Sequence, residues 1–592
     1  MALTARAALR RLSDLRWQYG GDAAAERRVL LDVLERRRLA RAKDVSDLHE
    51  LLCILYAYPD DRAVFDQVER MLRAFDRRAD LRRHRDDLVD TGIAGTVIFY
   101  RFEAPTARWL AERWGQHLTI DWEEVDAERV ARHLTLLSLA AECPGLDEPP
   151  LEGRAWLDRL RGDDTDAAFL ARRAADVEAG ALVRNRVYDE LGLMLRLAPG
   201  PDTPSRSRAR YERSPFVPQA EPMREGRPDL RVEARTPPRA IRFVSPREGA
   251  RLIDLARESM VTRSRDLHAF AHAGPRDVRM IDGGDGLEFA CIGVEPEHRH
   301  LLEAVYGFLI LRNGVPIGYA LASALFRSSE IAFNIFETYR RAEAAFVYGR
   351  LLGALVTLFG SDTFTVFPYQ LGHENEEGVE SGAWWFYYKL GSRPRDPATL
   401  RLVRRELARM RRRPSYRSSP ATLRQLARQN VFLDLAGVRD DVMGVWASDA
   451  VGLTVTDYLN RRFGSDRARA LRRCADEAAR LLLSGDWRRF PSGERLAWER
   501  LSPVVLLLPG VAGWPAADRR ALGAILRAKG SRRETAFVDL INRHPRFHGA
   551  LTRLGARRGT PRRSRSRPTA EGAEIAEGIN HGGHSAAEPQ PN

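Results

Sequence analysis

The chain has 592 residues, a formal net charge of +14 and 44% hydrophobic residues. It is too long for a single hydrophobic core, so we expect roughly three or four domains, and its composition excludes a chain disordered throughout. Only three of its 95 basic residues are lysines, so the positive charge reflects arginine usage. Such a charge is weak support for a nucleic-acid partner, and we expect none.

The cysteines and the apolar runs narrow the class of protein further. Cys53, Cys143, Cys291 and Cys474 lie far apart, without the close pairs that bind zinc. We therefore expect reduced, buried thiols in a cytoplasmic protein. The longest apolar run, 502–515, is short and broken by proline and glycine, so we expect no membrane partner.

The first part of the chain has helical periodicity. In 46–56 a capping Ser46 precedes apolar residues at the spacing of one helix face. The glycine-punctuated, β-branched segment 92–100 is either a strand or an extended loop. We predict an all-α N-terminal domain over 1–198.

Between 199 and 238 the composition shifts to proline, arginine, serine and glutamate with few apolar residues. This composition is typical of a linker between domains or of a segment wrapped over its neighbour. The basic run at 206–210 fits an acidic partner, but a solvated linker is the commoner structure.

A mixed pattern of strands and helices occupies 239–398, which we predict to be one domain. Ser245, Pro246 and Glu248 mark a helix start, and Asn313-Gly314 is typical of a tight hairpin turn. The expected elements, in order, are 241–244, 247–260, 278–281, 287–294, 306–312, 315–325, 331–336, 344–359, 363–369 and 380–390.

The remainder of the chain is predicted to be helical as far as residue 555. A basic stretch, 399–430, begins this C-terminal region and is divided at Pro414 and Pro420. The tail 556–592 has few apolar residues and is predicted to be disordered.

The most specific motif is AWWFYYKLG at 383–391. Together with the order of strands and helices before it, the motif resembles the ending of the GNAT acyl-CoA N-acyltransferases, over about a quarter of the chain. Ser392 stands where the family usually has phenylalanine. The resemblance implies an α+β fold with a central GNAT-like mixed sheet and flanking helices, set between all-α N-terminal and C-terminal regions.

The resemblance also implies catalytic groups. Tyr387 matches the tyrosine that protonates the leaving thiolate, a role that suits a phenol at close range. Glu330 and Glu337, near the strand that matches the family's fourth, are candidates for the general base that deprotonates the amine. The alternatives are a core aromatic residue for Tyr387 and solvated strand-end charges for the glutamates.

The expected cofactor contacts are less regular. The family's glycine-rich pyrophosphate loop is missing at 339–349, where Glu343 would repel a diphosphate, although a helix N-terminus attracts anions. If an acyl-CoA such as acetyl-CoA binds, the resemblance assigns its contacts to Phe336, Thr338, Arg340, Arg341 and Asn375.

Two functions remain open from the sequence. The first is acyl-CoA-dependent N-acyl transfer, with acetyl as the first candidate acyl group, to an amine on a small molecule or a protein by direct attack on the thioester. The second is a catalytically inactive GNAT-like scaffold for protein or RNA. A dense group at Glu295, Glu297, His298 and His300 is more typical of a solvated loop than of a metal site, so we expect no metal.

Overall fold

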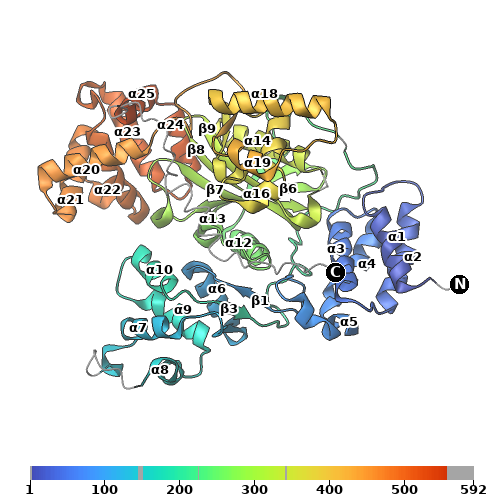
Figure 1. Ribbon diagram of the computed structural model, residues 1–592. Coiled ribbons are helices and arrows are strands. Elements are labelled where there is room, and N and C mark those ends of the chain that lie inside the picture. Colours follow the sequence, from blue (N-terminus) through green and yellow to red (C-terminus); the bar gives the residue numbers. More distant parts are fainter. Residues whose placement is uncertain (1–2, 144–150, 225, 341–342, 557–592) are drawn as a thin grey trace.

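The computed structural model describes residues 3–143, 151–224, 226–340 and 343–556 (Figure 1). In this part the chain is α+β, with a nine-stranded mixed sheet at the centre and helical units before and after it. The predicted disordered tail lies outside the described residues apart from Ala556, and Arg341 lies outside them as well.

The first helical unit packs against the central sheet, because its buried leucines belong to the same hydrophobic cluster as the sheet residues. Side-chain oxygens of Thr4 and Asp61 accept backbone hydrogen bonds at two of its helix starts, as capping residues do. Its helices are α1 (Ala5–Leu15), α2 (Ala23–Arg36), α3 (Ala42–Ala57), α4 (Arg62–Arg73) and α5 (Ala79–Arg83).

A second N-terminal unit has a separate hydrophobic core and a small sheet. Its strands β1 (Ile98–Tyr100), β2 (Leu118–Ile120) and β3 (Leu195–Leu197) are antiparallel in the order β1-β3-β2. The prediction of an all-α N-terminal region is therefore wrong. Strand β1 lies within 92–100, for which the sequence left a strand open, whereas β2 and β3, of three residues each, are too short to show alternation in a sequence. The helices are α6 (Ala104–Trp114), α7 (Ala127–Leu137), α8 (Gly153–Leu160), α9 (Asp166–Asp176) and α10 (Ala181–Asp189).

The connector 199–238 is a packed segment, and it contacts both sides that it joins. The backbone N–H of Tyr211 donates to the Gly314 carbonyl at 2.8 Å, and that of Gln219 donates to the Pro59 carbonyl at 2.7 Å. Apart from the short helix α11 (Leu230–Glu233), it contains no helix or strand in its described residues. The connector is therefore a segment wrapped over its neighbours and not a solvated linker.

The central sheet has the strand order β11-β12-β10-β9-β8-β7-β6-β5-β4. Neighbours are antiparallel except β9 and β10, which run parallel and are joined by helix α14 (Ala344–Phe359), since a parallel pair needs a long crossover. The strands are β4 (Ala240–Phe243), β5 (Ala273–Gly284), β6 (Leu287–Val294), β7 (Ala304–Arg312), β8 (Val315–Leu325), β9 (Ser328–Ile335), β10 (Thr363–Val366), β11 (Arg393–Pro394) and β12 (Val431–Asp434).

Strand β12 shows that the central domain extends beyond its predicted end. We expected the mixed domain to end at residue 398, but β12 inserts between β10 and β11 from within the predicted helical region. Two helices, α18 (Pro397–Arg412) and α19 (Pro420–Leu426), separate β11 from β12. Four residues between helices carry too little pattern for a strand prediction.

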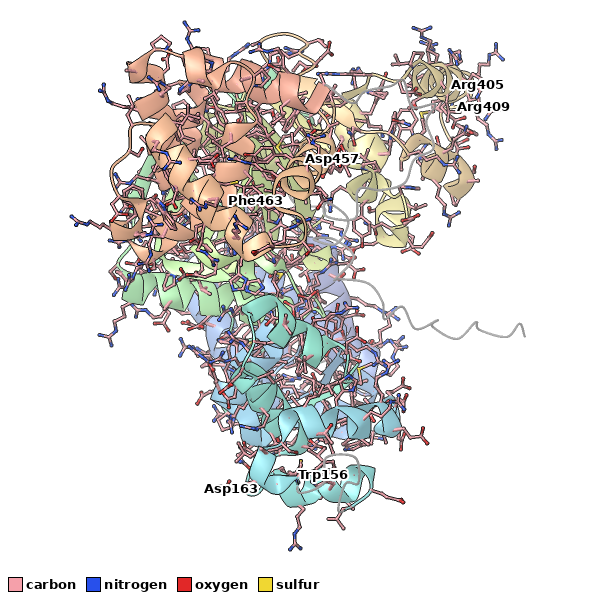
Figure 2. All side chains as sticks on the ribbon, turned by 90° about the vertical axis from the view of Figure 1, so that its left-hand side faces the viewer. Trp156, Asp163, Arg405, Arg409, Asp457 and Phe463 are labelled. Atoms are coloured by element: carbon pink, nitrogen blue, oxygen red, sulfur yellow. The ribbon has the colours of Figure 1, made fainter. Side chains whose placement is uncertain are left out.

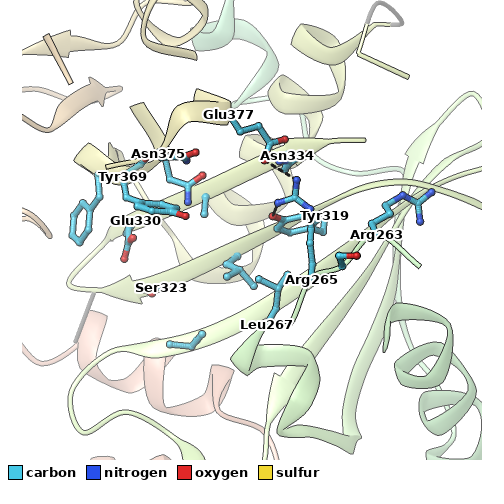
Figure 3. A pocket seen from close by; sticks show the side chains of 16 residues that line it. Arg263, Arg265, Leu267, Tyr319, Ser323, Glu330, Asn334, Tyr369, Asn375 and Glu377 are labelled. Carbon is cyan, nitrogen blue, oxygen red and sulfur yellow. Dashed lines mark hydrogen bonds and ion pairs between the residues drawn. The ribbon is translucent and has the colours of Figure 1, made fainter. Parts of the chain in front are cut away.

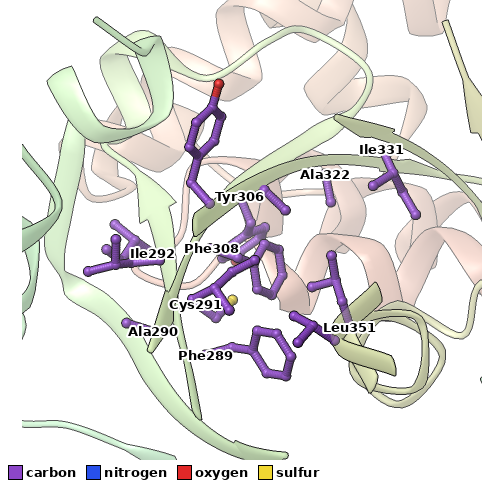
Figure 4. Close-up of a cluster of buried hydrophobic side chains, with 14 of the residues drawn as sticks. Phe289, Ala290, Cys291, Ile292, Tyr306, Phe308, Ala322, Ile331 and Leu351 are labelled. Carbon is purple, nitrogen blue, oxygen red and sulfur yellow. The ribbon is translucent and has the colours of Figure 1, made fainter. Parts of the chain in front are cut away.

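Helices cover both faces of the sheet. Figure 1 places α12 (Pro246–Val261) and α13 (His268–Ala271) on one face and α14 on the other. Figure 4 shows the core on the α14 side, where Phe289, Cys291 and Phe308 of the sheet meet Leu351 of α14; all are buried. None of the helices in the described ranges is long and apolar enough to cross a membrane.

The predicted aromatic helix, 380–390, is α17 (Ala383–Lys389), and a separate short helix precedes it. Helix α16 (Glu376–Glu380) ends before Gly382, whose φ of +67° lies in the left-handed region, and α17 follows. The short helix α15 (Pro368–Leu371) precedes them. This arrangement places 367–377 over the end of β10, beside β9.

The C-terminal unit is helical, as predicted, and packs on the α14 side of the sheet (Figure 1). Its helices are α20 (Asp449–Phe463), α21 (Arg467–Leu481), α22 (Ser492–Leu506), α23 (Ala516–Lys529), α24 (Thr535–Asn542) and α25 (Pro545–Ala556).

Candidate functional site

A cavity of about 170 Å³ lies on the α12–α13 face of the sheet (Figure 3). Its walls come from the turn between α12 and α13, from β7, β8 and β9, and from 367–377. The volume is below the range of roughly 300–1,000 Å³ typical of drug-sized ligands, and it corresponds to about six water molecules at roughly 30 Å³ each. It therefore fits a small molecule or the end of a larger one.

Glu330 on β9 is a titratable group in this cavity with a strongly shifted pKa. Its register partner is Ser323 on β8, whose own partner on β7 is Val305, and all three line the cavity. Burial, followed by the negative charge of Glu303, raises the pKa of Glu330 to about 7, while His300 and a hydrogen bond with Ser323 oppose the rise. A carboxyl group with this pKa exchanges protons near neutral pH, as a general base must.

A chain of ion pairs closes one side of the cavity. Arg265 donates to Glu377 at 2.7 Å and to the Tyr319 hydroxyl at 3.2 Å (Figure 3). Arg340 donates to the same carboxylate of Glu377. Burial opposes ionisation of Glu377, but the two arginines keep its pKa below the usual range. Glu377 is thus held as an anion, and Arg340, a predicted phosphate ligand, is already paired.

Asn375 lines the cavity but has a structural role in this state. Its side-chain oxygen accepts the Gly378 N–H at 3.2 Å and caps α16, while its amide nitrogen donates to the Tyr369 carbonyl at 3.0 Å. Because its carbonyl and its amide both have partners, Asn375 positions the 367–377 wall.

Tyr387 lies on the other face of β9. Its hydroxyl bonds to the backbone of Phe333, and its ring lies 5.6 Å from that of Tyr348 on α14. Side chains alternate along a strand, so Phe333 points away from the face of Glu330. Tyr387 is 2% exposed, does not line the cavity, and has a raised pKa because it is buried. The structure does not bring Tyr387 and Glu330 into one cavity.

The segment after β9 is covered by parts of the chain that are distant in sequence. The Thr338 hydroxyl donates to Glu50 of α3 and accepts from Arg206 of the connector at 2.7 Å. Phe336 donates its N–H to the Ile317 carbonyl at 3.0 Å, and its ring lies 3.7 Å from the guanidinium of Arg263.

Glu337, the second predicted base, is exposed and lies outside the cavity lining. The two glutamates were alternatives in the sequence, and the cavity distinguishes Glu330 from Glu337 by position.

A second hollow of about 470 Å³ lies at the start of α14. Trp17, Arg224, Arg340 and Phe346 contribute to its walls, and so does Glu343, whose carboxylate accepts the Arg224 N–H at 3.2 Å. The hollow thus places two arginines and one glutamate at a helix N-terminus, where anions are favoured.

Within the described residues, no group of three or more histidine, cysteine, aspartate or glutamate side chains is arranged to hold a metal ion. In the loop that the sequence singled out, His300 pairs with Glu303 at 2.8 Å and His298 stacks on His272 at 3.7 Å between ring centres. The four cysteines are buried and unpaired.

Several cavity residues escaped the sequence analysis. Ser323 and Tyr319 share a face of β8, and the hairpin register could have placed them opposite Glu330 and Asn334. Arg265 lies in an irregular turn with no periodic signal.

No protein-family model, curated protein or solved structure matches this chain.

Proposed function

We propose that the protein is an acyl-CoA-dependent N-acyltransferase and that its amine substrate enters the cavity beside Glu330. The observation that carries the proposal is the position of Glu330, a carboxyl group with a pKa of about 7 on the strand that forms a parallel pair with β10. Neighbouring Tyr319 and Tyr369 add aromatic walls, which suit a cationic group.

In the proposed reaction Glu330 removes a proton from the ammonium group, and the free amine attacks the thioester carbonyl carbon. The new N–C bond forms a tetrahedral oxyanion, which backbone N–H groups at the 337–338 turn would stabilise. The C–S bond then breaks and coenzyme A leaves as a thiolate, while the new amide nitrogen releases its remaining extra proton to water. Tyr387 remains the proposed donor of the proton to that sulfur, from the opposite face of β9.

The donor phosphates are assigned to the hollow at the start of α14, where Arg224 and Arg340 would contact them. Arg340 would then exchange its ion pair with Glu377 for one with phosphate. The acyl chain would reach the cavity past the point where the pairing of β9 with β10 ends, at Glu330 and Thr365.

The test is release of coenzyme A from acetyl-CoA by the full chain with a panel of small primary amines. Glu330→Gln keeps the shape but removes the base, and we expect kcat/KM to fall about 100- to 10,000-fold with acetyl-CoA affinity unchanged by calorimetry. Tyr387→Phe should lower kcat with little effect on affinity. Glu337→Gln, an exposed change nearby in the chain, is the matched control and should retain activity.

One observation favours the alternative, a catalytically inactive scaffold. Thr338 and Arg340, two predicted cofactor ligands, are bonded to Glu50 and Glu377. If millimolar acetyl-CoA gives no heat of binding to the full chain, the enzyme proposal fails and the scaffold remains. Binding of acetyl-CoA without turnover of any amine in the panel would support the acetyl-CoA site but not the proposed transfer reaction.

A further inference from the structure

Positive charge is concentrated in one segment of the chain. Residues 401–428 contain ten arginines and a single acidic residue, Glu406, hence a net charge of +9, whereas the whole chain carries +14. Overall charge argued weakly for a nucleic-acid partner, but the structure places most of the excess on α18, the loop after it and α19.

The acidic residue of this segment is used internally. Glu406 is fully buried and accepts hydrogen bonds from Tyr416 at 3.0 Å, Ser418 at 2.6 Å and Arg409 at 2.8 Å. Trp385 of α17 also donates to Ser418, at 3.1 Å. These bonds hold the 413–419 loop against α18, so the segment has a defined shape with its carboxylate turned inward.

The outward face consists of unpaired arginines. Arg409 pairs with Glu406, and Arg424 pairs with Glu376. The other eight are exposed and form no ion pair with any carboxylate of the described residues, and six of these eight lie on α18 or at its C-terminal end. Figure 2 shows Arg405 and Arg409 on this helix at the edge of the molecule. The six, which we call the α18 basic surface, are Arg401, Arg404, Arg405, Arg411, Arg412 and Arg413.

We propose that the α18 basic surface binds the phosphate backbone of a nucleic acid. A helix of 16 residues is about 24 Å long, and phosphates follow one another every ~3.4 Å along one strand of a duplex. The surface therefore spans several phosphates. The guanidinium fork matches two phosphate oxygens at once, so arginine suits this contact better than lysine does.

The α18 basic surface lacks the exposed apolar side chains that an anionic membrane or an acidic peptide would contact. Among the described residues of 397–428, no large hydrophobic side chain is exposed. A helix that binds a lipid surface needs an apolar face, and a docked peptide needs pockets for its side chains. A row of arginines without apolar neighbours fits a phosphate backbone, because phosphate contacts depend on charge and on spacing.

The test is fluorescence anisotropy of the full chain with a labelled 20-nucleotide single-stranded RNA between 50 and 200 mM NaCl. If about five phosphates are contacted, log K should fall with log salt with a slope of about −3.5, and affinity should drop about 100-fold over this range. A 20-base-pair DNA duplex is the second arm and should also bind.

Replacing Arg404, Arg405 and Arg412 by Gln should weaken binding and make the slope shallower by about two. The same three changed to Lys keep the charge and should keep the slope. The matched control changes Arg469, Arg472 and Arg473, three exposed arginines of α21, to Gln. It should leave the affinity and the salt slope unchanged.

Three results would overturn the proposal. They are absence of binding at 50 mM salt, an equal loss in the α21 control, and binding of anionic vesicles or polyglutamate at least as tight as that of RNA. The outcome is independent of acyl transfer, since none of the substituted arginines lines the cavity.

Discussion

At the scale of single residues, the protonation of Glu330 depends on its neighbours. Glu303 lies two residues before Val305, which is linked through its register partner Ser323 on β8 to Glu330 on β9. His300 holds Glu303 at 2.8 Å, and this pair keeps the pKa of Glu303 low despite its burial. An ionised Glu303 is thus one reason for the raised pKa of Glu330.

This arrangement predicts the pH dependence of the proposed reaction. Activity needs ionised Glu330, so kcat/KM should rise with pH through about 7. Glu303→Gln removes a negative charge, and the rising limb should shift to lower pH by about half a unit to one unit.

The measurement is a pH–rate profile from pH 5 to 9. Glu297→Gln, an exposed change in the same loop, should leave the profile unmoved. A shift of the limb to higher pH in Glu303→Gln would contradict the assigned role.

The raised pKa of Glu330 also makes the stability of the fold depend on pH. The folded-state pKa of Glu330 lies above its unfolded value, so the folded state binds the proton more tightly. Its contribution to stability is fully present below the unfolded pKa and is lost as pH rises towards 7.

At the scale of elements, α14 is held at a fixed distance from the connector. A Cβ built on Gly353 would lie 2.4 Å from the Thr236 carbonyl oxygen, so only glycine allows this approach. The close contact fixes the helix that joins the parallel strands β9 and β10, and with it the wall beside Glu330.

Gly353→Ala should therefore destabilise the protein by about 1–3 kcal/mol, because backbone must move to admit the methyl group. Gly452→Ala is the matched control, since Gly452 is an exposed helical glycine of α20 with no neighbouring atom within 4 Å of the added Cβ. That change should stabilise by about 0.5–1 kcal/mol. Urea unfolding of both variants measures the difference, and equal effects would refute the close-packing argument.

At the scale of the whole molecule, buried charges join the C-terminal unit to the sheet. Lys529 donates to the Glu303 carbonyl at 2.7 Å and pairs with Glu534 at 2.6 Å, and both side chains are almost fully buried. Arg299 donates to the carbonyls of Lys529 and Ser531, at 2.7 Å each. The C-terminal helices thus support the loop that carries Glu303 and His300.

Lys529→Met leaves Glu534 without its lysine, and we expect a loss of about 3–5 kcal/mol in unfolding free energy. Arg527→Met breaks the exposed pair of Arg527 with Glu494 and should cost about 1 kcal/mol or less. Chemical denaturation compares the two variants. A loss for Lys529→Met no larger than the control would show that the buried pair contributes little.

Much of the central fold followed from local patterns. The Ser245–Glu248 helix start, the Asn313-Gly314 hairpin and the bounds of α14 were all predicted from neighbouring residues. Short elements were missed, such as β12 and the three-residue strands β2 and β3 of the N-terminal unit, because their stability comes from partners and not from their own sequence.

For the candidate site, the sequence by itself determined that Glu330 lies beside or on a strand of a mixed sheet, predicted at 331–336 and found as β9, and that Tyr387 lies on an aromatic helix. Only the tertiary structure decided that these two residues face opposite sides of β9 and that Glu330 shares a cavity with Arg265 and Glu377. The physical reason is range: periodicity records which face a residue takes within its own element, whereas a cavity forms from contacts between segments separated by tens to hundreds of residues.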